Sequence, residues 1–277
     1  AMLVVLFLLR VPVAFAMIII GAGGFAYLNG IQSAMHLIAQ DIFDTFSSHP
    51  LSVIPTFILM GSFAYASGIS RRLYLAAYTW LGHLRGGLTL ATVLACSGFA
   101  AICGSTAATA ATMGRIAVPE MKKYNYDDSF ATGTVAAAGT LGILIPPSTV
   151  FIVYGIMTEE SIGKLFLAGI VPGVLLTLFF LLTVATLCVR NPKLGPAAPS
   201  ASWKEKFSSL LGIVEAIILF GLAVGGLFLG WFSPTQAGGI GAFGALVIGL
   251  FRGGFSLKIT LEAARDGLRT ACMVLFI

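Results

Sequence analysis

Charged residues are scarce in this sequence: 16 Lys and Arg and 11 Asp and Glu make up 10% of its 277 residues. Soluble domains carry about a quarter charged residues. Hydrophobic residues instead reach 58%, and the mean hydropathy is +0.98. The composition excludes an ordinary soluble domain and predicts a protein embedded in a lipid bilayer. The net charge of +5 therefore bears on membrane topology rather than on nucleic-acid binding.

Several chemical motifs are also missing. The sequence contains no Gly-x-x-x-x-Gly-Lys-[Ser/Thr] phosphate loop, which excludes ATP binding by that route. It has no His, Cys and carboxylate cluster with metal-ligand spacing, and its four cysteines are interpreted as packing residues. Paired catalytic residues inside the apolar runs are absent as well. We therefore expect no enzyme, no transition-metal site and no organic cofactor.

The most unusual stretch is residues 139–148, inside an uncharged run, 129–158, that is long enough to cross a bilayer. Pro146 and Pro147 each lack a donor N–H, and each ring clashes with the preceding helical turn. A broken backbone at membrane depth persists only where it is buried in protein or lines a polar cavity, as in the binding sites of secondary transporters. We predict a broken helix here; the alternative is a proline-kinked helix with only a packing role.

A second uncharged run, residues 88–114, is rich in small and hydroxyl side chains between positions 103 and 114. Small residues let backbones approach closely, and hydroxyls supply oxygen ligands. Ser105 can cap a new helix that starts after Gly104. This run predicts a re-entrant hairpin with its tip at residues 104–106. The alternative is a straight helix that packs through Ala and Gly.

The Lys and Arg clusters favour the hairpin. Cytoplasmic loops carry an excess of Lys and Arg. If the linker 190–206 is cytoplasmic, Arg71, Arg85 and Lys122 fall on the same side only when residues 88–114 enter and leave the membrane from that side. A straight span would separate Lys122 and the linker from the other two clusters.

Four regions are expected along the chain. Residues 1–87 form first-repeat scaffold helices and an interfacial arm, 88–189 a transport region with the hairpin and broken helix, 190–210 a cytoplasmic linker, and 211–277 a connecting helix with the start of a second repeat. Both ends look cut, so we expect part of a longer protein. The predicted membrane spans are residues 11–28, 51–68, 165–189, 211–232 and 236–251. Two further stretches are predicted to be amphipathic helices at the membrane interface, residues 31–48 and 256–269.

The order of elements suggests an internal repeat. Residues 10–16 and 233–238 each hold a proline turn between an apolar helix and a glycine-rich helix. By the charge argument the first turn is cytoplasmic and the second is not, as in the inverted repeats of secondary transporters. We therefore predict an all-α polytopic membrane protein of the ion-transporter type, with inverted repeats, a re-entrant hairpin and discontinuous helices. Glu215, near the start of its span, is expected to reach the interface or to pair with a linker Lys.

Six short motifs together resemble the large membrane subunit of tripartite ATP-independent periplasmic (TRAP) transporters, and the resemblance covers essentially the whole chain. It implies a multi-pass protein of a bacterial inner membrane that works with a small four-helix membrane subunit. It also implies a periplasmic binding protein that delivers a small organic acid, and sodium-coupled import by elevator-like motion. The motifs are residues 10–16, 54–61, 82–87, 104–114, 139–148 and 233–237.

The candidate ion site uses neutral oxygens. Asp and Glu are absent from the hairpin tip and from the broken segment, which is compatible with sodium and argues against a carboxylate proton relay there. Helix N-termini near Ser105 and Ser148 can face an anionic substrate. The resemblance implies that the family's sodium site lies at Gly104, Ser105, Thr106, Thr109, Gly139, Thr140, Gly142, Ile145 and Pro147.

Two other functions remain open from the sequence. The first is a sodium-dependent dicarboxylate or citrate carrier of the same architecture that works without a binding protein. The second is a membrane scaffold that transports nothing, or an intramembrane enzyme, although the enzyme would need the paired catalytic residues that are missing.

Overall fold

The computed structural model describes residues 2–47, 49–253 and 255–276, and every regular element within them is helical. This confirms the all-α prediction for the described part of the chain. η1 and η2 are short 3-10 helices, and η3 is a turn of π-helix. The elements are α1 (Met2–Leu8), α2 (Val13–Asn29), α3 (Ile31–Ser47), η1 (His49–Ser52), α4 (Val53–Ala66), α5 (Ile69–Leu81), α6 (Gly87–Cys103), α7 (Thr106–Lys123), α8 (Asp128–Gly139), η2 (Thr140–Ile143), α9 (Thr149–Met157), α10 (Ile162–Arg190), α11 (Trp203–Phe220), η3 (Gly221–Gly225), α12 (Gly226–Phe228), α13 (Pro234–Phe251) and α14 (Leu257–Phe276).

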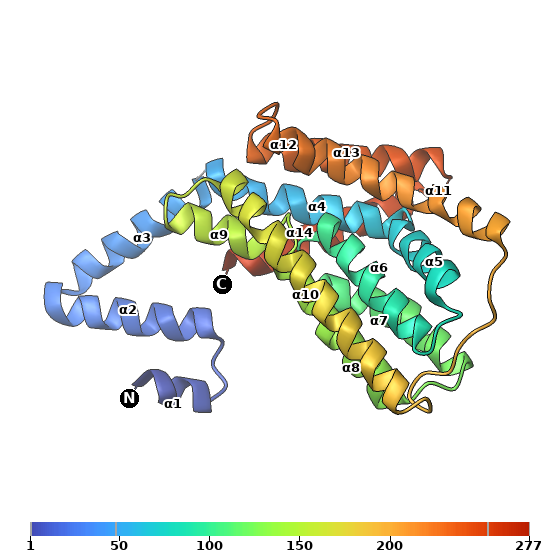
Figure 1. Cartoon of the computed structure of the whole chain (residues 1–277). Coiled ribbons are helices and arrows are strands. Elements are labelled where there is room, and N and C mark those ends of the chain that lie inside the picture. The colour runs from blue at the N-terminus through green and yellow to red at the C-terminus, as the bar shows by residue number, and fades with distance from the viewer. Residues whose placement is uncertain (1, 48, 254, 277) are drawn as a thin grey trace.

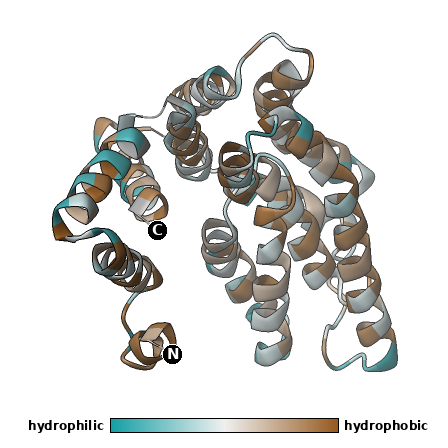
Figure 2. Cartoon of the chain, turned by 90° about the vertical axis from the view of Figure 1, so that its left-hand side faces the viewer, coloured by the Kyte–Doolittle hydropathy of each residue, from teal (hydrophilic) through white to brown (hydrophobic). Residues whose placement is uncertain are grey.

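The helices form a bundle with a projecting arm. Helices α1, α2 and α3 stand apart from the rest, at the left of Figure 1. Both predicted amphipathic stretches are helical, and α14 continues the second one without a break to residue 276. Hydrophobic residues cover much of the length of the helices, as expected for a chain that faces lipid (Figure 2).

Several helices are long and apolar enough to cross a membrane. Among the described residues these are Ile162–Arg190, Trp203–Phe228 and Pro234–Phe251. A fourth candidate is the pair Pro50–Ala66 and Ile69–Leu81, which bends by 61°. The chain is therefore a multi-pass membrane protein, and its spans agree with the runs predicted at residues 51–68, 165–189, 211–232 and 236–251.

Helix α6 occupies the centre of the bundle. Its residues are buried along nearly its whole length, from Gly87 to Cys103. Helix α4 packs against it and against both α13 and α14. Small residues make the α4–α13 contact close, because a Cβ added to Gly238 or Gly241 would collide with the side chains of Thr56 or Met60.

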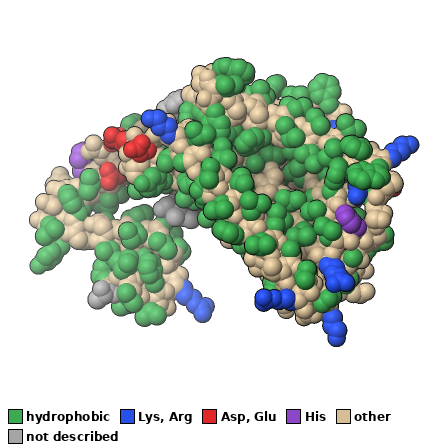
Figure 3. Space-filling view, viewed as in Figure 1, with side chains coloured by type: hydrophobic (Ala, Val, Ile, Leu, Met, Phe, Trp, Pro, Cys, Tyr) green, Lys and Arg blue, Asp and Glu red, His purple; other side chains and the backbone are tan. Residues whose placement is uncertain are grey.

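One end of the bundle joins three segments that are distant in sequence. The Gly86 N–H donates to the Gly195 carbonyl oxygen (2.8 Å), and the Tyr126 hydroxyl donates to the Pro196 carbonyl oxygen (2.8 Å). Tyr126 also accepts a hydrogen bond from the Leu88 N–H (3.3 Å). The start of α6, the loop after α7 and the linker therefore meet. Figure 3 shows Lys and Arg side chains at the right and lower right of the face in view, and others on its left side.

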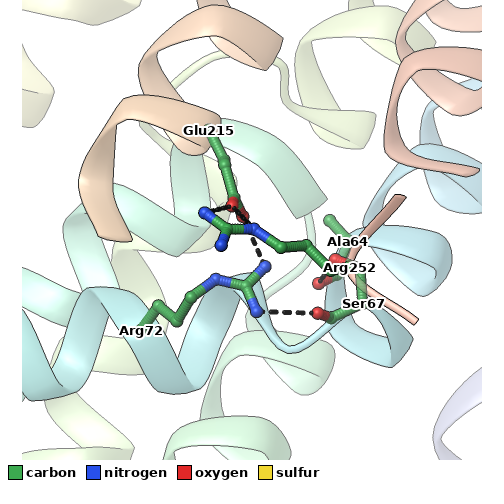
Figure 4. Close-up of polar contacts among 5 residues, drawn as sticks. All are labelled: Ala64, Ser67, Arg72, Glu215 and Arg252. Atoms are coloured by element: carbon green, nitrogen blue, oxygen red, sulfur yellow. Dashed lines mark hydrogen bonds and ion pairs between the residues drawn. The ribbon is translucent and has the colours of Figure 1, made fainter. Parts of the chain in front are cut away.

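An ion triad around the buried Glu215 connects three helices (Figure 4). The Glu215 carboxylate on α11 lies 2.5 Å from the guanidinium of Arg72 on α5 and 2.5 Å from that of Arg252, which follows α13. The Glu215 side chain is 11% exposed. The expectation that Glu215 pairs with a linker Lys is wrong, because 12 residues of helix after Trp203 carry it about 18 Å into the bundle.

The triad gives a stability prediction. Glu215→Ala leaves two guanidinium groups without their counter-charge, so we expect the free energy of unfolding to fall by about 2 kcal/mol, given that Arg252 is half exposed. Glu120→Ala removes the exposed Glu120–Lys123 pair and should change it by less than about 1 kcal/mol. Thermal unfolding of both variants in detergent tests this, and equal shifts in the two would contradict it.

Candidate functional site

The predicted break at residues 139–148 is present in the structure. Helix α8 ends at Gly139, η2 follows, and α9 begins only at Thr149, so the kinked-helix alternative is wrong. The Pro146–Pro147 peptide bond within the break is cis. Ser148 caps α9: its Oγ accepts a hydrogen bond from the Phe151 N–H (3.4 Å). The break thus supplies a new helix N-terminus inside the bundle.

The stretch at residues 103–106 turns the chain between two helices that pack against each other. Helix α6 ends at Cys103, and Gly104 adopts the left-handed conformation with φ of 62°. Ser105 then caps α7 by accepting a hydrogen bond from the Ala108 N–H (3.4 Å), as predicted. The straight-helix alternative is wrong, because Gly104 takes a backbone conformation that few other residues adopt.

The hairpin turn and the helix break meet directly. Both the N–H and the hydroxyl of Thr149 donate to the Gly104 carbonyl oxygen, at 3.3 Å and 3.2 Å. A Cβ added to Gly104 would collide with the Pro147 carbonyl oxygen. A Cβ added to Gly142 would lie 2.7 Å from the Ser105 carbonyl oxygen and 2.9 Å from the Thr106 nitrogen. The two backbones therefore approach each other without an intervening side chain.

Most of the predicted ion-site residues lie at this meeting point. Gly139 belongs to it, because a Cβ there would lie 2.8 Å from Ala110 Cβ on α7. Thr109 is fully buried, with its hydroxyl 3.1 Å from Cys103 Sγ. Thr106 Oγ1 is buried, and no hydrogen-bond partner reaches it within the described residues. An unpaired buried hydroxyl is costly, which sets this oxygen apart from the other polar groups at the meeting point.

Two predicted residues point elsewhere. The Thr140 side chain is exposed, and its hydroxyl donates back to the Ala137 carbonyl oxygen (2.6 Å). The Ile145 side chain packs against Gly173 of α10, where an added Cβ would lie 2.8 Å from Ile145 Cγ1. At Thr140 and Ile145, therefore, only the backbone carbonyl oxygens could contribute to an ion site.

The two predicted substrate-facing serines differ in their surroundings. Ser148 is fully buried, and its hydroxyl donates to the Ile143 carbonyl oxygen (2.6 Å). Ser105 lines a cavity of about 150 Å³, which we call the tip cavity. The polar side chains around the tip cavity are Ser62, Tyr65, Ser105, Thr112, Thr270 and Asp266.

The sequence analysis missed Gly61 and Asp266. Gly61 on α4 lies against the hairpin turn, because a Cβ there would be 2.8 Å from Cys103 Cα. The motif at residues 54–61 held a signal for this glycine. Asp266 reaches the tip cavity because α14 packs on α4, and no local pattern around Asp266 indicates that contact.

The polar groups at the meeting point of the hairpin turn and the helix break include oxygens of the backbone and of hydroxyl side chains. Within residues 2–47, 49–253 and 255–276, no group of three or more His, Cys, Asp or Glu could hold a metal ion. Among these oxygens are the Ser105 carbonyl, which already accepts a hydrogen bond from the Thr109 N–H (3.0 Å), the Pro147 carbonyl and the unpaired hydroxyl of Thr106. Neutral oxygens of this kind coordinate hard cations.

Comparison with known proteins gives a family match over residues 1–277, to "Tripartite ATP-independent periplasmic transporter, DctM component". The chain is 41% identical to the C4-dicarboxylate TRAP transporter large permease protein DctM of Pseudomonas aeruginosa, over 83% of this chain and 53% of the relative. It is 32% identical to the ectoine/5-hydroxyectoine TRAP transporter large permease protein UehC of Ruegeria pomeroyi, over 99% of this chain and 64% of the relative. The corresponding values for the sialic acid TRAP transporter large permease protein SiaM of Vibrio cholerae are 29%, 95% and 61%. The chain thus spans about half the length of the first relative.

The close backbone approach predicts a contrast between two glycines of one segment. Gly142→Ala places a methyl group 2.7 Å from the Ser105 carbonyl oxygen, so we expect the free energy of unfolding to fall by about 1–3 kcal/mol. Gly133 on α8 has no neighbour within 4 Å of an added Cβ, so Gly133→Ala should raise stability by up to about 1 kcal/mol. Thermal unfolding compares the two; a harmless Gly142→Ala would contradict the contact.

Proposed function

The chain belongs to the DctM-component family of tripartite ATP-independent periplasmic transporters, and on that premise we propose that it acts as the large permease subunit of a sodium-coupled importer of small organic acids. It works in a bacterial inner membrane, with a small membrane subunit and a periplasmic binding protein as partners. The family description names a tripartite periplasmic transporter, which supports this assembly.

Sodium coupling rests on one observation above all: the unpaired, buried Thr106 hydroxyl. It lies where the Gly142 backbone touches the first turn of α7. A sodium ion there would accept this oxygen and nearby carbonyl oxygens as ligands and would satisfy groups that lipid cannot. The site is neutral when empty and positively charged when the ion is bound. The electrostatic field around the site therefore affects how often the ion occupies it.

The way the segments are joined supports an elevator mechanism. Gly104 and Thr149 are hydrogen-bonded, so the hairpin α6–α7 and the broken segment α8–α9 move as one unit. Glu215 and its two arginines hold α5, α11 and the end of α13 together as a frame. The tip cavity lies between the hairpin α6–α7 and helices α4 and α14, and α4 packs in turn against α13, so sliding of the hairpin would change the exposure of the cavity.

The substrate class comes from the relatives. Their names give C4-dicarboxylate, isethionate, sialic acid and ectoine as transported compounds. Because the C4-dicarboxylate permease shares 41% identity with this chain, we propose a small carboxylate as substrate. Ser105 caps the N-terminus of α7, and the positive end of that helix dipole can face the substrate carboxylate.

Uptake measurements test the whole proposal. The full-length permease, its small membrane subunit and its binding protein are reconstituted in proteoliposomes with labelled succinate. We expect uptake only when the inward sodium gradient and the binding protein are both present. Uptake that needs sodium alone would assign the protein to the carriers that work without a binding protein. No uptake of succinate or of the relatives' other named compounds, under any gradient, would contradict transport.

The ion site has its own test. Thr106→Val keeps the side-chain shape and removes the hydroxyl, so we expect the half-saturating sodium concentration to rise about tenfold, which corresponds to one lost ligand. Thr132→Val is the control, because Thr132 is exposed on α8 and bonds only to its own helix. A sodium dependence that is the same in both variants would rule out Thr106 as a ligand.

A further inference from the structure

The tip cavity has the features of a second site, on another side of the hairpin turn. Its volume of about 150 Å³ has room for several water molecules. Hydroxyl groups line it from three directions: Ser62 and Tyr65 on α4, Ser105 at the hairpin turn, and Thr270 on α14. Such convergence of polar side chains inside a membrane protein is unusual unless water or a ligand occupies the space.

Asp266 is the one charged residue that lines the tip cavity. Its side chain is exposed at the mouth, and within the described residues no ion pair or hydrogen bond reaches its carboxylate. Arg269, one turn further along α14, is also exposed and forms no ion pair with it there. An unpaired carboxylate beside a cavity lined by polar residues attracts cations.

We propose that the tip cavity binds a small cation, with Asp266 as its charged ligand and the surrounding hydroxyls as neutral ligands. The occupant is sodium or the ammonium group of a substrate. A lone carboxylate attracts such a cation and repels a substrate carboxylate. This site differs from the neutral one at Thr106, yet Ser105 touches both: its side chain lines the cavity, and its carbonyl oxygen faces Gly142.

Binding can be measured without transport, which separates this inference from the proposed function on which its use rests. The purified full-length permease is unfolded thermally in increasing NaCl, with choline chloride keeping the ionic strength constant. A ligand that binds the folded state raises the midpoint. A parallel series uses methylammonium chloride as the probe for an organic ammonium group. The variants are Asp266→Asn, Asp266→Glu and Thr106→Val.

Asp266→Asn should raise the half-saturating concentration of the effective cation about threefold to tenfold, because one exposed charge is lost. Asp266→Glu should restore most of the response. Glu262→Gln is the matched control, since Glu262 lies one turn earlier on α14, is exposed and does not line the cavity. Loss of the sodium response identifies the inorganic ion, and loss of the methylammonium response identifies a substrate group.

Other results overturn one claim or the other. If Asp266→Asn responds to both salts as wild type does while Thr106→Val loses its sodium response, the cavity site is wrong and sodium coupling stands. If sodium does not raise the unfolding midpoint of wild type, but methylammonium raises it and Asp266→Asn abolishes that rise, the cavity site stands and sodium coupling fails. If Glu262→Gln weakens binding as much as Asp266→Asn, the effect is general surface charge and the cavity site is wrong.

Discussion

The structure depends on one constraint: backbone groups released by two helix breaks inside an apolar bundle must find partners within the protein. They find them in each other. The Gly104 carbonyl oxygen accepts from Thr149, and Gly142 lets its backbone reach Ser105. Neither break could exist alone at this depth, because lipid offers no hydrogen bonds. The pair creates a polar spot lined by backbone and small side chains, which is the chemistry that an unhydrated ion needs.

The surrounding helices keep this polar spot in place. Helix α6 is buried along nearly its whole length, so the hairpin turn begins from a rigid support. Helix α4 carries Gly61 against Cys103 and contacts both α13 and α14 through small residues. The ion triad at Glu215 then joins α11 to α5 and to the end of α13. Close packing and one cluster of paired charges together define the wall that faces the hairpin.

Local features of this fold were predictable, and long-range contacts were not. The helix break, the turn at Gly104 and the cap at Ser105 follow from residue types whose backbone preferences act over a few positions. The partners of Glu215 and the place of Asp266 depend on which helices become neighbours, and this is decided by packing over the whole bundle. The sequence therefore indicated most of the residues where the hairpin turn and the helix break meet, and it did not indicate that Asp266 lines the tip cavity.

The linker between α10 and α11 has a mechanical consequence. Gly195 accepts from the Gly86 N–H, and the Ala198 N–H donates to the Gly82 carbonyl oxygen, both at 2.8 Å. These two bonds bridge the short turn between α5 and α6, which is the covalent joint between frame and hairpin. The linker is thus hydrogen-bonded to the turn between α5 and α6 and restrains it. Bending that turn means breaking both bonds or moving the linker with it, so the stiffness of the connection between α5 and α6 depends on a segment that belongs to neither helix.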